Sequence, residues 1–380
     1  MAPRLAVVTD LPTPYRAPLF DAIAARGRVD LHVLYLAQGE TGRASWRVDC
    51  SGHPHTFLAG GAVTFRARKG PFAWKWNVGI GRRLSEIAPD VISVGGWAHP
   101  AMHLAMGWAR RRGVPYLVTS ESHPRRHGLL RARAKAFVAG RAVRGAAGWL
   151  PVSSRAQDLL VSLGADPARC RLVPNAPDAR RFAAARADVS ARAATRARLG
   201  VGAEPVTLFV GRLIPAKGLA TLLDAARLLA PRTPRLFVVG AGPLSKRLAG
   251  AMTLLGERGY DEIVALQAAA DVSVLPSIHE PYGVALHEGM AAGCAGLASD
   301  AVGAAADLVE DGVTGRTFPA GDAAALVAAW SDLLADPARL QTIGAAASRR
   351  AIERGLDFTV EQTEAAAIEA ASVHTAARAR

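Results

Sequence analysis

Residues 271–293, DVSVLPSIHEPYGVALHEGMAAG, join a short apolar run to a loop and then to a helical pattern. The run DVSVLPS (271–277) is bounded by Asp and Ser, as a buried strand is. Pro281 suits the first position of the helix that follows. Gly289 and Gly293, with alanines between them, let that helix approach a sheet closely. The stretch therefore predicts a strand, a loop and a helix, the repeating unit of a parallel sheet.

The same alternation fills most of the chain. Helical patterns are expected at 100–112, 129–145 and 218–230, and strands on either side of them imply parallel sheets covered on both faces. Two such series predict an α/β protein with two doubly wound, Rossmann-like domains, divided in or near VPNAPDARRF (173–182). The predicted strands are 4–10, 29–36, 90–96, 114–120, 206–212, 235–242, 271–277 and 295–299.

Length and composition narrow the class of protein. The chain has 380 residues, of which 50% are apolar, and Arg, Gly or Pro interrupts every candidate membrane span. The opening residues MAPRLAVVTD resemble a first strand rather than a secretory signal. Cys50, Cys170 and Cys294 are far apart and lack metal-binding spacing. We therefore expect a reduced, cytoplasmic protein without a metal site.

The positive charge is concentrated in the first half. Residues 1–200 carry 31 Lys and Arg against 12 Asp and Glu, whereas residues 201–380 carry 15 against 20. The densest stretches are 109–113 and 123–145. Such a surface attracts nucleic acid, anionic lipid headgroups or a phosphorylated substrate. A solvated Arg-rich face without any partner is an equally weighted alternative.

Candidate binding residues follow the predicted strands, where parallel sheets bind ligands. In VGRLIPAKG (210–218), Arg212 and Lys217 stand beside a helix start, a good site for a diphosphate, although a basic surface loop is the alternative. In VVGAGPL (238–244), Gly240 and Gly242 indicate either close approach to a ligand or a tight turn.

Two carboxylates, Glu280 and Glu288, flank the loop and helix of the opening stretch. Each accepts two hydroxyl hydrogen bonds and so suits the vicinal diol of a ribose or a hexose. Glu288 is expected two turns into the helix. The amides of residues 282–284 are expected to be free at the helix start. The alternative is a helix-terminal charge at Glu280 and a solvated Glu288.

These motifs carry a family resemblance. VGRLIPAKG, VVGAGPL, EPYGVALHEGMAAG and VGAAADLVEDGVTG (302–315) resemble the retaining family 4 glycosyltransferases of GT-B fold, with the E-x7-E pattern intact. TDLPTPYRAPLF (9–20) is similar to the start of a bacterial subgroup. The resemblance implies two domains facing across a cleft: residues 1–175 bind the acceptor, residues 176–357 bind the donor, and a helix at 358–380 returns to the N-terminal domain.

The resemblance also implies roles for the candidate residues. Arg212 and Lys217 would bind the diphosphate of a UDP- or GDP-sugar, and Glu288 would bind its ribose. Glu280 would hold hydroxyls of the transferred sugar, and no metal or other cofactor would be required. The nearby amides would be those of Tyr282, Gly283 and Val284.

The chain departs from the family in its N-terminal half. LPTPYR (11–16) replaces a glycine-rich loop. Where the family often has a histidine near the reacting sugar carbon, this chain has Glu121 after the strand VPYLVTS. Glu121 is the favoured candidate for that catalytic position, and His123 and His99 remain alternatives.

The sequence therefore predicts a hexosyltransferase that retains anomeric configuration, in synthesis of bacterial cell-surface glycans or glycolipids. We expect it in the cytoplasm or peripherally on the inner face of the membrane, with a glycan or lipid-linked acceptor. Alternatives are a GT-B epimerase or hydrolase of sugar nucleotides, and a basic nucleic-acid-binding protein, which lacks a recognisable reading motif. PFAWKWN (71–77), within the loops expected at 38–78, suits either sugar stacking or a membrane-facing edge.

Overall fold

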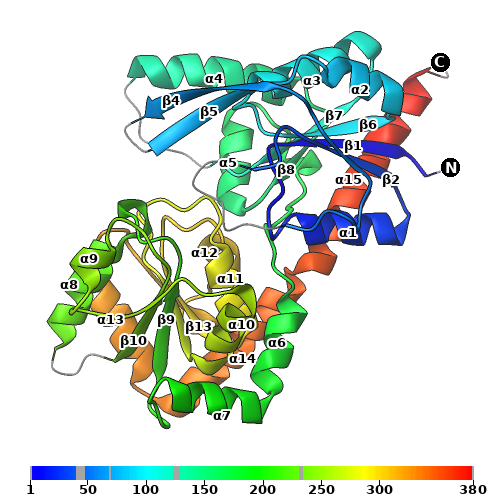
Figure 1. Ribbon diagram of the computed structural model, residues 1–380. Helices are drawn as coiled ribbons and strands as arrows, with labels where there is room; N and C mark the ends of the chain where they lie inside the picture. The colour runs from blue at the N-terminus through cyan, green and yellow to red at the C-terminus, as the bar shows by residue number, and fades with distance from the viewer. Residues whose placement is uncertain (1, 40–47, 68–69, 123–128, 231–233, 379–380) are drawn as a thin grey trace. The chain divides into compact units, whose positions relative to one another are not determined.

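The computed structural model describes residues 2–39, 48–67, 70–122, 129–230 and 234–378 (Figure 1). The chain forms two compact units, which are described separately. Unit 1 comprises Met1–Asn175 and Asp357–Arg380, and unit 2 comprises Ala176–Leu356. The last helix, α15 (Leu356–Arg378), therefore packs almost entirely with unit 1, where Glu364 on α15 accepts from Arg28 at 3.2 Å.

Unit 1 contains a six-stranded parallel sheet with the order β3-β2-β1-β6-β7-β8. Its strands are β1 (Arg4–Thr9), β2 (Asp30–Tyr35), β3 (His55–Phe57), β6 (Val91–Gly95), β7 (Tyr116–Ser120) and β8 (Gly148–Pro151). Its helices besides α15 are α1 (Ala17–Arg26), α2 (Ile80–Ile87), α3 (Pro100–Arg112), α4 (Leu129–Arg144), α5 (Ser154–Ser162) and the 3-10 turn η1 (Pro167–Arg169). A separate antiparallel hairpin joins β4 (Gly61–Ala67) to β5 (Gly70–Trp76).

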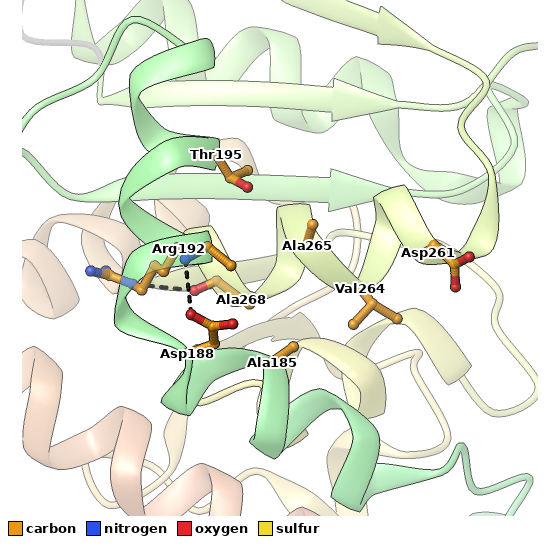
Figure 2. A pocket seen from close by; sticks show the side chains of 9 residues that line it. Ala185, Asp188, Arg192, Thr195, Asp261, Val264, Ala265 and Ala268 are labelled. Atoms are coloured by element: carbon orange, nitrogen blue, oxygen red, sulfur yellow. Dashed lines mark hydrogen bonds between the residues drawn. The ribbon is translucent and has the colours of Figure 1, made fainter.

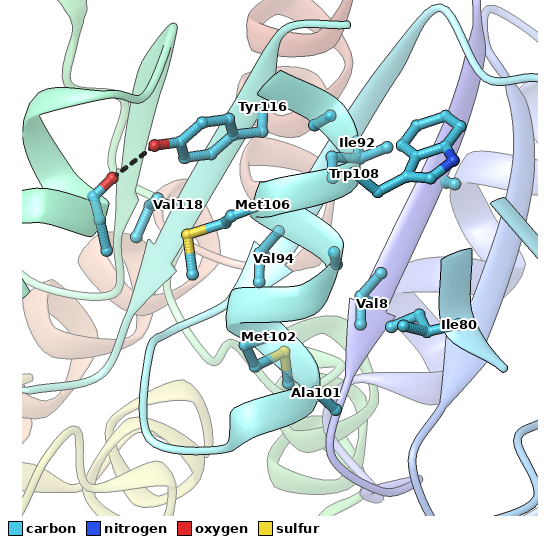
Figure 3. Close-up of a cluster of buried hydrophobic side chains, with 14 of the residues drawn as sticks. Val8, Ile80, Ile92, Val94, Ala101, Met102, Met106, Trp108, Tyr116 and Val118 are labelled. Atoms are coloured by element: carbon cyan, nitrogen blue, oxygen red, sulfur yellow. Dashed lines mark hydrogen bonds between the residues drawn. The ribbon is translucent and has the colours of Figure 1, made fainter. Parts of the chain in front are cut away.

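The core of unit 1 forms where α3 covers the sheet (Figure 3). Met102 and Met106 on α3 are fully buried against Val94 on β6 and its neighbours. Tyr116 is also buried here and its hydroxyl donates to the carbonyl oxygen of Ala142 at 2.9 Å, so its polar group is satisfied. This packing fixes the central strands whose ends carry the polar residues described below.

Unit 2 repeats the same arrangement, with the strand order β11-β10-β9-β12-β13-β14. Its strands are β9 (Val206–Val210), β10 (Arg235–Val239), β11 (Thr253–Gly256), β12 (Val272–Leu275), β13 (Ala295–Ser299) and β14 (Gly315–Phe318). Its helices are α6 (Ala179–Ala187), α7 (Val189–Arg198), the 3-10 turn η2 (Pro215–Lys217), α8 (Leu219–Leu229), α9 (Ser245–Leu248), α10 (Tyr260–Ala269), α11 (Val284–Ala291), α12 (Ala305–Leu308), α13 (Ala323–Leu334) and α14 (Pro337–Glu353).

Each sheet has one place where the strand order reverses, and we call it the reversal point. In unit 1 the reversal point lies between β1 and β6, and in unit 2 it lies between β9 and β12. Crossover connections leave from these two neighbouring strands in opposite directions. In open sheets of this kind, such a reversal opens a crevice at the carboxyl ends of the two strands, and ligands bind there.

The structure confirms the predicted α/β class, and each predicted strand matches an observed strand to within a few residues. The prediction of loops over 38–78 is wrong, because residues 55–76 include β3 and the β4–β5 hairpin. Among the described residues, no helix is both long and apolar enough to span a bilayer.

Candidate functional site

The loop after β9 carries the two cations predicted to bind a diphosphate. The Lys217 side chain folds back over Gly211, and its Cε atom lies 3.7 Å from the position that a Cβ on Gly211 would take. Arg212 is exposed, and its side chain forms no hydrogen bond or ion pair within the described ranges. Both residues thus begin from the same turn at the carboxyl end of β9, with Arg212 available to a ligand.

Lys217 meets Glu280, which follows the neighbouring strand β12. The ammonium of Lys217 pairs with Glu280 Oε2, and the Ser277 hydroxyl donates to the same oxygen at 3.3 Å. The two charged side chains are only 17% and 12% exposed. This ion pair across the reversal point of unit 2 was not predicted, since the sequence does not show which loops meet.

A glycine contact brings these two loops together. Gly218 has a left-handed φ of +68°, and a Cβ there would lie 1.7 Å from the carbonyl oxygen of Pro276. The amide of Ile278 also donates to the carbonyl oxygen of Ala216 at 3.0 Å. Only glycine allows the loop after β9 to touch the loop after β12 in this way, so Gly218 positions Lys217 beside Glu280.

Helix α11 begins at Val284, so the prediction that it starts at Pro281 is wrong. Gly283 has φ +106°, which a continuing helix cannot include, and Glu280 pairs as a β-bridge with Val302. The carbonyl of Tyr282 accepts from the amide of Ala304 at 2.7 Å. Glu288 therefore lies about one turn into the helix rather than two.

The three amides predicted to face a ligand precede or begin this helix. Those of Tyr282, Gly283 and Val284 donate no hydrogen bond to another described backbone group. Helix starts leave such amides without an intrahelical acceptor.

Glu288 is a buried acid. Its residue is 8% exposed, and its carboxyl group has no hydrogen bond or ion pair with any described residue. Burial raises its pKa to about 8, because removal from water disfavours the charged form. The alternative of a solvated Glu288 is therefore wrong. A buried carboxyl that has no partner among the described residues is a candidate for function.

A buried hydrogen-bond chain that the sequence analysis missed supports the same loop. The carbonyl of Ala351 accepts from Nε2 of His287 at 2.8 Å, so Nδ1 of His287 accepts from the Tyr282 hydroxyl, 2.7 Å away. Burial lowers the pKa of His287 to about 4, and the ring is neutral. The sequence signal that could have identified His287 was its position next to Glu288.

The two glycines after β10 approach protein backbone. A Cβ on Gly240, whose φ is +131°, would lie 2.0 Å from the carbonyl oxygen of Gly211. A Cβ on Gly242 would lie 2.5 Å from that of Leu213. These two glycines therefore make close contact with the neighbouring loop after β9, and their predicted approach to a ligand stays a prediction.

In unit 1, Glu121 directly follows β7, as predicted, and its carboxylate is held by two side chains. Oε1 accepts from Arg16 at 2.9 Å and from Asn175 at 3.1 Å. Arg16 ends the LPTPYR segment, and its role was not predicted. His99 lies at the start of α3, with Nε2 3.5 Å from Oδ2 of Asp10, and His123 lies outside the described residues.

A cavity of about 170 Å³ lies elsewhere in unit 2, between α6, α7 and α10 (Figure 2). Its polar side chains are engaged with the protein: Arg192 donates to the carbonyl of Ala268 at 3.2 Å, and Asp261 pairs with Arg181. Asp188 accepts from the amide of Ala191 at 2.9 Å. None of the predicted site residues lines this cavity, and its polar groups serve to join the three helices.

Comparisons with known proteins agree with this architecture. Residues 12–176 match the model of the glycosyl transferase 4-like domain, and residues 204–336 match that of glycosyl transferases group 1. The chain is a member of the family 4 type of glycosyltransferases, with the GT-B fold.

Two curated relatives illustrate the similarity. A D-inositol 3-phosphate glycosyltransferase of Geodermatophilus obscurus is 31% identical over 305 residues, covering 75% of this chain and 64% of the relative. A GDP-mannose-dependent alpha-(1-6)-phosphatidylinositol monomannoside mannosyltransferase of Mycolicibacterium smegmatis is 34% identical over 199 residues, covering 48% and 51%. The chain spans about half the length of most curated relatives it matches.

Solved structures share the fold at low identity. HepE of Anabaena in complex with UDP has a TM-score of 0.76 and 20% identity, covering 95% of this chain and 98% of that one. Sucrose-phosphate synthase of Thermosynechococcus elongatus has a TM-score of 0.72 and 21% identity, covering 95% and 97%.

Proposed function

We propose that this protein transfers a sugar from a nucleoside diphosphate sugar to a hydroxyl acceptor, with retention of anomeric configuration. The observation that carries the proposal is the reversal point of unit 2. There Lys217 and Glu280 form an ion pair, and on the following helix α11 Glu288 lies buried without a partner among the described side chains. Such a site combines a cation for phosphate with carboxyl groups for hydroxyls.

Lys217 and Arg212 are proposed to bind the donor diphosphate. Breaking the glycosidic bond places negative charge on the leaving diphosphate, and fixed cations stabilise that charge without rearrangement. Lys217 has three donor hydrogens, so it can bind a phosphate oxygen while keeping its contact with Glu280. Arg212, which is exposed, can bind phosphate oxygens in a bidentate manner.

The two acidic residues are proposed to bind hydroxyl groups of the donor. Glu280 is held by Lys217 and Ser277 and would accept from the transferred sugar. Glu288 would bind the ribose diol, which supplies the hydrogen bonds that its carboxyl group lacks among the described residues. The amides of Tyr282, Gly283 and Val284 would contact the donor nearby, as would the turn at Gly240 and Gly242.

The roles proposed for the two domains and for Glu121 are those that the family resemblance implies. We propose that residues 1–175 bind the acceptor, that residues 176–357 bind the donor, and that helix 358–380 completes the acceptor domain. Glu121 is proposed to lie at the reacting sugar carbon, because Arg16 and Asn175 hold its carboxylate in one orientation. The names of the curated relatives favour cyclitol or lipid-linked acceptors, and UDP and GDP are both candidate donor bases.

The donor site is tested by a thermal-shift screen with UDP, GDP, UDP-glucose and GDP-mannose. A true ligand raises the melting temperature by mass action. Lys217→Ala is expected to abolish the shift, whereas Lys246→Ala, at an exposed lysine of unit 2, keeps it. If none of the four nucleotides shifts the wild type, or if Lys217→Ala responds normally, the donor site is wrong.

Contact with an anionic membrane is a further part of the proposal. The hairpin strand β5 exposes Trp74 and Trp76 by 43% and 46%, and α4 exposes Phe137 by 69%. Exposed indoles suit a lipid headgroup layer, and the exposed Arg141 and Arg144 of α4 would be attracted to anionic lipids. Sedimentation with anionic vesicles at low and high salt tests this idea, and the absence of binding at both salt concentrations would reject it.

A further inference from the structure

The reversal point of unit 1 gathers three polar side chains from separate segments. Asp10 directly follows β1, His99 lies four residues after β6, and Lys75 reaches inward from the hairpin strand β5. Asp10 Oδ1 pairs with the Lys75 ammonium, and Asp10 Oδ2 lies 3.5 Å from His99 Nε2. The carboxylate thus lies between the two nitrogen groups, at the crevice where a parallel sheet of this order binds ligands.

Lys75 and His99 are buried, whereas Asp10 is partly exposed, and this difference indicates different roles for the three side chains. The side chains of Lys75 and His99 are 6% and 10% exposed, whereas that of Asp10 is 37% exposed. Burial alone would raise the pKa of Asp10, but hydrogen bonds with His99 and Lys75 outweigh it and lower that pKa. Asp10 is therefore an ionised, oriented carboxylate that solvent and solutes can reach.

The buried charge of Lys75 is not needed to attach the β4–β5 hairpin to the rest of unit 1. The side-chain amide of Asn77, directly after β5, already donates to the carbonyl oxygens of Leu36 and Leu58, each at 3.2 Å. Burying a lysine and pairing it with a carboxylate carries a desolvation cost that a neutral anchor avoids. The Lys75–Asp10 ion pair is better explained by its effect on Asp10, because Lys75 holds the carboxylate of Asp10 in place.

We infer that the reversal point of unit 1 is a binding site for a neutral polyol, a sugar or cyclitol, whose hydroxyl groups donate to Asp10. Lys75 and His99 are positioning residues. The inference deepens the proposed function and rests on it in one respect: the polyol would be the hydroxyl acceptor. The second carboxylate on this edge, Glu121, is a further group that can accept hydrogen bonds from hydroxyl groups.

The test uses the full chain saturated with UDP and three probes: myo-inositol, D-glucose and D-mannose. Binding of each is measured by saturation-transfer difference NMR. The wild type is expected to bind at least one probe, and Asp10→Asn to bind it about tenfold more weakly or worse, because a charge-assisted hydrogen bond is lost. A wild type that binds none of the three, or an Asp10→Asn variant that binds as well as wild type, overturns the inference.

Asp90→Asn is the matched control. Asp90 pairs with Arg4 at 3.9 Å and accepts from the Arg4 amide at 2.8 Å, beside the same strands β1 and β6 but at their amino ends. It is expected to leave polyol binding unchanged. Should Asp10→Asn fail to fold, Lys75→Gln replaces it, with the same expected loss and the same overturning result. The UDP thermal shift of each sample reports unit 2 separately, so failure of the donor site is distinguishable from failure of this inference.

Discussion

The two reversal points share one topology and carry opposite arrangements of charge. In unit 2 a cation, Lys217, follows the first strand β9, and a carboxylate, Glu280, follows β12. In unit 1 a carboxylate, Asp10, follows the first strand β1, and a histidine follows β6. In this fold the reversal point is where a ligand is expected to bind, and the residues at the strand ends decide its chemistry. According to the proposals above, unit 2 binds a diphosphate and hydroxyl groups, and unit 1 binds hydroxyl groups.

The supports of the two sites also differ. In unit 2 the loops from neighbouring strands touch backbone to backbone at Gly218 and Pro276. In unit 1 the central carboxylate is reached by Lys75 from a hairpin outside the main sheet. We therefore expect the site of unit 2 to be sensitive to any added side-chain atom, and the site of unit 1 to be sensitive mainly to loss of charge.

The largest effect is expected for Gly218→Ala. The added methyl would overlap the Pro276 carbonyl, and we expect a loss of about 4 kcal/mol in the free energy of unfolding and loss of the UDP thermal shift. Gly200→Ala is the control, because Gly200 has nearly the same φ, +66°, but nothing within 4 Å of the added atom. It should lose only about 1 kcal/mol. Equal losses measured by urea unfolding would contradict the contact argument.

Glu288→Gln is expected to stabilise the chain at alkaline pH. The pKa of this glutamate is 4.5 in the unfolded chain and about 8 in the folded one. Between these values the folded state holds a proton that the unfolded state has lost, so wild-type stability falls as the pH rises. Glu288→Gln has no such titration and keeps its stability as the pH rises. The difference between its free energy of unfolding and that of the wild type should therefore grow above pH 4.5 and reach a few kcal/mol at pH 8.

This prediction needs urea unfolding at several pH values and a control. Glu353→Gln, at an exposed position on α14, should show no such pH-dependent advantage. The same Glu288→Gln protein is expected to bind UDP more weakly, since it loses the proposed contact with the ribose. A stability advantage that does not change with pH would show that Glu288 is not a buried acid.

Tyr282→Phe is expected to cost about 2 kcal/mol in the free energy of unfolding. It removes the hydroxyl that donates to His287 and leaves a buried ring nitrogen without its donor. Tyr260→Phe, at a tyrosine that is 41% exposed, should change stability by less than about 0.5 kcal/mol. Equal effects of the two variants would mean that the Tyr282–His287 bond does not stabilise the fold.

The smallest effect is expected for Arg16→Gln in unit 1. Its partner Glu121 is 40% exposed, so the ion pair is screened by water, and we expect a loss below about 1 kcal/mol. Donor binding in unit 2, measured by the UDP thermal shift, should not change. A loss of several kcal/mol would show that this pair is an essential part of the unit 1 core.

The sequence predicted the fold more completely than the site. Strands such as β9 and β12 and helices such as α8 have strong periodic patterns, and their positions were predicted to within a few residues. The start of α11 was misplaced, because the left-handed φ of Gly283 and the pairing of Glu280 with Val302 are tertiary features. The β4–β5 hairpin was missed because its strands pair only with each other.

The pairings within the sites were the least predictable part. Lys217 and Glu280 are 63 residues apart, and Asp10 and Lys75 are 65 residues apart. Lys217 and Glu280 were identified beside predicted strands, whereas Asp10 and Lys75 were not among the candidate residues. Only the folded chain shows which side chains meet. Lys75 in particular looked like one basic residue among many in a positively charged half.

The placement of α15 in unit 1 has a consequence for synthesis on the ribosome. Glu364 on this helix is fully buried and contacts Arg26 and Arg28 near the beginning of the chain, at 3.6 and 3.2 Å. During translation, the first 175 residues emerge long before the helix that completes their unit. Unit 2 is therefore free to fold first as one continuous segment, while the nascent amino-terminal region waits for its last helix.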